Sequence, residues 1–135
     1  MVSSGYKELE HTADIALRAW GEDFFALLRQ SAKGMYELMG VDFSLNNPKE
    51  VEFAIEENDR DIQLVDFLNE ILYLVEEDEA VYKSFTFTKD TQGILVQASG
   101  YKAKSIQRNI KAVTFHNLAV EETDLGLEVS ITFDV

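Results

Sequence analysis

The sequence predicts an α+β protein in which two helices pack on a mostly antiparallel or mixed β-sheet. Two segments carry apolar residues at spacings of three and four, which is typical of helices that bury one face. Most other apolar residues alternate with polar ones in short segments separated by turn residues, which is typical of strands joined as hairpins. Hairpin strands pair antiparallel, so we expect the helices to cover a sheet of this kind.

The first expected elements are a strand and a helix. In the strand, Ile15, Leu17 and Ala19 share one face, and Asp14 stands at its entrance. Asp14 either closes a turn by bonding to backbone amides or has a functional role. A helix is expected over residues 22–40 and ends at Gly40. Its apolar face consists of Phe24, Leu27, Leu28, Ser31, Ala32, Met35, Leu38 and Met39.

A second strand and a second helix follow. Pro48 is expected in a turn before a strand at 50–57, where alternate residues are apolar. The helix is expected over 58–79, capped by Asn58 or Asp59, with Asp61 placed favourably for the helix dipole. Its apolar stripe consists of Leu64, Leu68, Ile71 and Val75, with Val65 and Leu72 alongside.

The rest of the chain is expected to form strands. Residues 80–103 are interpreted as two strands around a turn at 90–93, and 111–122 and 127–135 as two more alternating segments. The acidic run 76–79 opposes the dipole at the end of the second helix. It is either a solvated helix end or a surface for a basic partner.

Length and composition indicate one domain over residues 1–135. A chain of 135 residues buries roughly two thirds of its unfolded surface, which is enough to sustain a hydrophobic core. The chain has no cysteine, which excludes disulfides, thiolate metal ligands and cysteine nucleophiles. There is no apolar leader and no apolar run near the roughly 20 residues of a membrane helix, so a cytoplasmic protein is expected.

The charge is strongly acidic, with 25 Asp and Glu against 12 Lys and Arg and a formal net charge of -13. Such a chain repels phosphate backbones, which argues against a nucleic-acid-binding surface. The same charge suits a cation or a basic protein partner, although acidic surfaces also serve solubility alone.

The end of the last strand offers a candidate metal site. Asp134 falls on the polar face of that strand, next to the last residue, Val135. If the first and last strands converge, Asp14, Asp134 and the Val135 carboxylate form a cluster of three anions. Each pair about 4 Å apart would repel by about 4 kcal/mol at an effective dielectric near 20. Oxygen ligands favour calcium or magnesium over zinc. The alternative to a metal site is that the chain ends at Val135 by chance.

Other candidate residues are less specific. His11 and His116 are isolated histidines without HExxH spacing, so a structural role is favoured over zinc binding for each. Lys111 is either a buried functional lysine or a solvated strand end. The sequence contains no GxSxG, P-loop or GxGxxG motif, so no nucleophile or nucleotide-binding loop is evident.

Four segments together resemble the archease family. They are "HTADI" at 11–15, "DIQLVDFLNEIL" at 61–72, "KAVTFH" at 111–116 and the terminal "DV". Their order and spacing match the family pattern over nearly the whole chain. Phe115 is a departure, because the family commonly has tyrosine there, and any role of that hydroxyl is in doubt.

The resemblance implies a protein cofactor rather than an enzyme. Archeases promote guanylylation and multiple turnover of the GTP-dependent RNA ligase of tRNA splicing and RNA repair, so the basic RNA-binding surface would belong to the ligase. The resemblance also implies a metal site, typically calcium, with magnesium or another divalent cation as alternatives. The ligands map onto Asp14, Asp134 and Val135.

The resemblance also points to residues that act on the partner. Lys111 and His11 are the candidates for partner activation. Two other functions remain open from the residues themselves. One is a metal-dependent hydrolase that uses the same carboxylates around an activated water. The other is a chaperone-like modulator of another RNA-modifying enzyme, which would need no metal.

Overall fold

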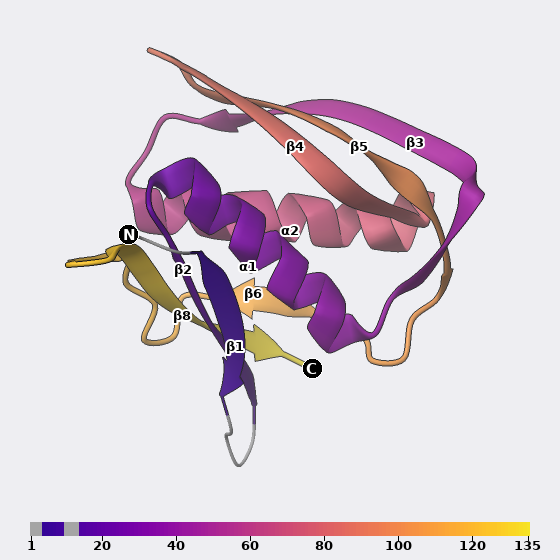
Figure 1. Ribbon diagram of the computed structural model, residues 1–135, viewed down its shortest axis with the longest axis horizontal. Helices are drawn as coiled ribbons and strands as arrows, with labels where there is room; N and C mark the ends of the chain where they lie inside the picture. Colours follow the sequence, from indigo (N-terminus) through magenta and orange to yellow (C-terminus); the bar gives the residue numbers. More distant parts are fainter. Residues whose placement is uncertain (1–3, 10–13) are drawn as a thin grey trace.

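The strands form two antiparallel sheets, and both helices lie between them (Figure 1). The computed structural model describes residues 4–9 and 14–135. In chain order the elements are β1 (Gly5–Leu9), β2 (Ile15–Gly21), α1 (Phe24–Met39), β3 (Asp42–Glu56), α2 (Arg60–Asp78), β4 (Ala80–Asp90), β5 (Gly93–Ser105), β6 (Ala112–Thr114), β7 (Glu121–Thr123) and β8 (Gly126–Asp134).

The two sheets differ in the number and order of their strands. The larger sheet has the order β1-β2-β8-β6, with β7 also paired to β8, and the smaller sheet has the order β3-β5-β4. All strand pairs among the described residues are antiparallel. The predicted α+β class is therefore confirmed. The sequence did not indicate that the strands divide into two sheets, with one sheet on each side of the helices.

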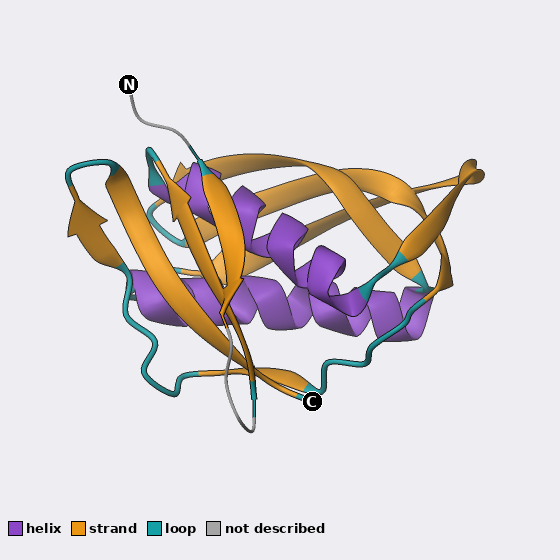
Figure 2. Cartoon of the chain, turned by 60° about the horizontal axis from the view of Figure 1, so that its bottom comes forward, coloured by secondary structure: helices purple, strands orange, loops and turns teal. Residues whose placement is uncertain are grey.

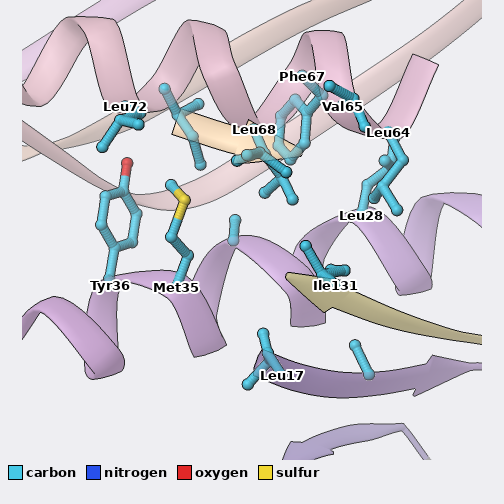
Figure 3. Close-up of a cluster of buried hydrophobic side chains, with 14 of the residues drawn as sticks. Leu17, Leu28, Met35, Tyr36, Leu64, Val65, Phe67, Leu68, Leu72 and Ile131 are labelled. Carbon is cyan, nitrogen blue, oxygen red and sulfur yellow. The ribbon is translucent and has the colours of Figure 1, made fainter. Parts of the chain in front are cut away.

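The hydrophobic core explains this layered arrangement. Side chains of both helices, such as Met35 and Leu68, meet Leu17 and Ile131 of the larger sheet (Figure 3). Helix α2 is buried around much of its circumference, and Phe67 is fully buried in addition to the predicted stripe. A helix with such a wide apolar surface needs a partner on more than one side. The predicted stripe of α2 is confirmed as core.

The ends of the helices follow local chemistry. The Asp23 side chain accepts a hydrogen bond from the Ala26 N–H at 2.8 Å and so caps α1. Gly40 ends α1 as predicted, with a φ of 61° that suits glycine. Asp59 is the N-cap of α2 but makes no side-chain capping bond. The acidic run 76–79 at the other end of α2 is exposed.

The structure differs from the sequence predictions in three places. Strand β1 was not predicted, because its five residues mix half-buried and exposed positions without clear alternation. The turn predicted at Pro48 is wrong: β3 continues through it, with a register shift between Ser44 and Pro48. Because β3 is an edge strand, it tolerates proline at a bulge. The expected strand over 111–122 forms only the short strands β6 and β7.

Candidate functional site

Strand register brings the two predicted aspartates together at one end of the larger sheet. Strand β8 lies between β2 and β6. On one side Ile15 of β2 is paired with Phe133, so Asp14 and Asp134 are the next residues along the two strands. On the other side Asp134 is paired with Ala112 of β6. The β6 strand and the C-terminus lie at the same end of the molecule (Figure 2).

The aspartates lie on the outer side of this sheet. Paired residues in an antiparallel sheet share a face, and successive residues alternate. Phe133 is fully buried, so the neighbouring Asp134 projects away from the core, and both Asp14 and Asp134 are exposed. Like charges placed opposite each other on adjacent strands repel. Among the described residues neither aspartate forms an ion pair, so this repulsion is not offset by a basic side chain.

The carboxylate oxygens of Asp14 and Asp134 are suitable ligands for a hard cation. Carboxylate oxygens are the ligands that calcium and magnesium prefer. The described part of the chain contains no group of three or more His, Cys, Asp or Glu side chains that could hold a metal ion. Two side-chain carboxylates alone make an incomplete cage, and the exposed Val135 adjoins them.

Lys111 lies at the same end of the sheet. Its backbone N–H donates a hydrogen bond to the carbonyl oxygen of Asp134 at 2.7 Å. The residue is exposed, which excludes the buried lysine considered from the sequence. Within residues 4–9 and 14–135, Lys111 makes no ion pair. Its ammonium group is therefore accessible to an acidic or phosphorylated group of a partner.

Two side chains of α2 hold the segment that follows Lys111. Asn69 Oδ1 accepts a hydrogen bond from the Val113 N–H at 3.0 Å. Asp61 Oδ1 accepts one from the Val120 N–H at 2.9 Å. Neither role was predicted from the sequence, because the bonded residues lie 44 and 59 positions away along the chain. No local pattern could have indicated them.

The other candidate residues do not join the two aspartates in the described structure. His11 lies outside the described residues. His116 is exposed beyond β6, where its N–H donates to Thr114 Oγ1 at 3.3 Å. Thr114 is paired with Thr132, which places it farther from the chain end than Asp134. Phe115 is 55% exposed, an unusual position for a large aromatic ring and one suited to a protein contact.

Neither α1 nor α2, the helices of the described residues, combines the length and apolar composition needed to cross a membrane.

Comparisons with known proteins agree on one family. Residues 6–135 match the Archease protein family (MTH1598/TM1083). The chain is 32% identical to Protein archease of Methanosarcina mazei, over 96% of this chain and 95% of the relative. It is 29% identical to Protein archease of Archaeoglobus fulgidus, over 96% and 98% of the two chains.

Two solved structures share the fold. Protein 1598 of Methanobacterium thermoautotrophicum gives a TM-score of 0.73 at 23% identity, over 97% of this chain and 99% of the other. A Thermotoga maritima protein, described as an archease and possible chaperone, also gives 0.73 at 23% identity, over 96% of each chain. At this identity the likeness concerns the fold alone.

Proposed function

This chain belongs to the archease family, and on that basis we propose that it is a protein cofactor of a GTP-dependent RNA ligase of tRNA splicing and RNA repair. It promotes guanylylation of the ligase and multiple turnover, and it is not itself an enzyme. The observation that supports this most directly is the convergence of Asp14, Asp134 and Lys111 at one exposed sheet end.

The chemistry of this end suits contact with another active site. Lys111 carries a flexible ammonium group that can bind a phosphate or a carboxylate of the ligase during guanylylation. The exposed Phe115 ring offers apolar contact area near the same strand. A formal charge of -13 would speed the encounter with a basic ligase, and this effect would weaken with added salt.

The proposed function includes a bound divalent cation. Asp14, Asp134 and the carboxylate of Val135 would hold it, and calcium suits an irregular oxygen cage better than magnesium does. When bound, the cation supplies positive charge that offsets the repulsion among these carboxylates. The two aspartates fit this role because they are adjacent and, among the described residues, unpaired with any basic side chain.

The test is ligase turnover with substoichiometric amounts of this protein. We expect wild type to raise both ligase–GMP formation and the number of ligations per ligase molecule. Asp134→Asn should lose most of this activation. Asp124→Asn, an exposed aspartate in the turn before β8, is the matched control and should retain it. A ligase that stays at single turnover with wild-type protein would refute the function.

Two other functions make different predictions. A metal-dependent hydrolase would cleave phosphoester substrates without the ligase, and this cleavage would require Asp134. A chaperone-like modulator of an RNA-modifying enzyme, a role in keeping with the words used for the Thermotoga maritima relative, would act equally well in the presence of a chelator. Assays of the protein alone and of the ligase with chelator separate the three.

A further inference from the structure

A groove lies between helix α1 and the edge strand β4. Its volume is about 540 Å³, which is within the usual range of small-molecule sites. From α1 the lining includes Arg29, Lys33 and Tyr36, and from β4 it includes Lys83, Ser84 and Phe85. Arg29 and Lys33 are four residues apart and so lie on one face of α1. The two elements pass beside each other in Figure 1.

The groove is basic, although the chain is acidic. Three of the 12 basic residues line it, and of the described residues no Asp or Glu does. The three ion pairs found in the described part of the chain involve other basic side chains. Arg29, Lys33 and Lys83 therefore have no carboxylate partner there. Such a local excess of positive charge favours an anionic ligand.

An aromatic ring of β4 holds one of these cations, Arg29, in place. The Arg29 guanidinium carbon lies 5.0 Å from the ring centre of Phe87, and its Nε and Nη2 both donate to the Phe85 carbonyl at 3.3 Å. The remaining guanidinium N–H groups are left for another acceptor. Lys83 Nζ instead lies 4.8 Å from the ring centre of Phe43 in β3, so its charge reaches across β5 and away from α1. The Arg29 charge is thus positioned at the groove before any ligand binds.

The edge of β4 is closed to an added peptide strand. Its Tyr82 N–H donates to the Tyr36 hydroxyl at 3.2 Å, and its Phe85 carbonyl accepts from Arg29. A peptide pairing with β4 would have to break both contacts. Burial raises the pKa of Tyr36 above its ordinary value, so its hydroxyl stays neutral and adds no negative charge. These features favour a compact ligand over an extended one.

We propose that this groove binds a small phosphorylated organic molecule of nucleotide size. The phosphate groups contact Arg29 and Lys33, and the planar part lies in the groove beside Phe85. A long nucleic acid is disfavoured, because the net charge of -13 repels it in proportion to its own charge. This binding site is independent of the sheet end that carries Asp134, and its test does not depend on ligase activation.

Binding is measured by calorimetry on the full chain with ADP, pyrophosphate and adenosine as probes. A chelator is present throughout, so that a metal–nucleotide complex cannot bind at the carboxylate end. We expect saturable binding of ADP, weaker binding of pyrophosphate and none of adenosine. Affinity for ADP should fall as ionic strength rises.

Two double variants with the same charge change locate the site. Arg29→Gln with Lys33→Gln should weaken ADP binding by about tenfold or more, because two charge-assisted contacts are lost. Lys89→Gln with Lys104→Gln, two exposed lysines outside the lining, should change it by no more than about twofold. Circular dichroism and thermal midpoints establish that both variants fold.

Several results would overturn the site. They are the absence of saturable ADP binding, equal affinity for ADP and pyrophosphate, and equal weakening in the two double variants. Tighter binding of a glutamate-rich peptide than of ADP, lost on changing Arg29 and Lys33, would assign the groove to a protein partner instead. In that case the phosphorylated ligand would be wrong.

Discussion

The carboxylate end of the larger sheet and the basic groove beside β4 carry opposite charges and are built by different means. At the sheet end, backbone register sets Asp14 beside Asp134, and no basic side chain of the described residues pairs with either. At the groove, Arg29 extends from α1 and rests on the Phe87 ring of β4, and Lys33 lies one helical turn away.

This contrast shows that net charge does not decide the sign of a site. A formal charge of -13 governs long-range steering, but solvent and salt screen it over about 8–10 Å. Within that distance, the side chains placed by the fold dominate. The carboxylate end should therefore respond mainly to cations, whereas the groove should respond to anions and to the packing of α1 on β4.

The largest expected effect tests the carboxylate end. Calcium at about 100 times its dissociation constant should stabilise the native protein by about 2.7 kcal/mol, or roughly 10 °C in thermal midpoint. Asp14→Asn and Asp134→Asn should each remove most of this shift, since each removes a charged ligand. The measurement is thermal unfolding with calcium and with chelator, and Asp124→Asn is the control. A full calcium shift in both Asn variants would show that the metal, if bound, binds elsewhere.

The second effect tests whether α2 holds β6 in place beside the carboxylate end. Asn69→Ala leaves the Val113 N–H without its acceptor, which should cost about 1–3 kcal/mol of unfolding free energy. It should also lower ligase activation by displacing β6 and Lys111. Urea denaturation measures the first effect and ligase–GMP formation the second. Asp66→Ala, an exposed change on the same helix, is the control. Loss of stability with unchanged activation would make Asn69 purely structural.

The third effect separates the Val135 carboxylate from the aspartate side chains. Adding two glycines after Val135 moves the charged group away and leaves a neutral peptide carbonyl, which is still able to bind calcium. Affinity should fall about tenfold, which lowers the stabilisation at fixed calcium by about 1.4 kcal/mol. The thermal midpoint in chelator should not change. If the extended protein keeps the whole calcium shift while the Asn variants lose it, Val135 is not a ligand.

The smallest effect concerns the groove. Tyr36→Phe removes the hydroxyl that accepts the Tyr82 N–H, at a cost of about 1 kcal/mol, because water in the groove can replace it in part. The calcium shift should stay at its wild-type value. Urea denaturation measures the cost, and calcium-dependent melting checks that the two regions are independent. A reduced calcium shift in this variant would mean that the groove and the sheet end are coupled.

Local spacing was enough to predict much of the fold. The repeat of apolar residues at three and four positions located both helices, and Gly40 correctly marked the end of α1. The prediction failed where tertiary context overrode a local signal. Pro48 usually indicates a turn, but on the edge strand β3 it needs no hydrogen-bond partner for its nitrogen and lies at a bulge.

The candidate site was predictable in its residues but not in its construction. Alternation placed Asp134 on the polar face of its strand, and the residues of this face are exposed or half-buried. The roles of Asn69 and Asp61 could not be predicted, because each bonds a backbone amide far away along the chain. The basic groove could not be predicted from the sequence either, because a strand and a helix separate Lys83 from the other two basic residues that line it, Arg29 and Lys33.

By itself the sequence determined the helices, most of the strands and the side of each strand that faces the core. These features depend on residues within a few positions of one another, whose spacing matches the period of a helix or a strand. Only the tertiary structure decided that β2 lies beside β8 and that α1 lies beside β4. Such neighbours are chosen by the packing of whole surfaces in one core, and no local spacing records which surfaces will meet.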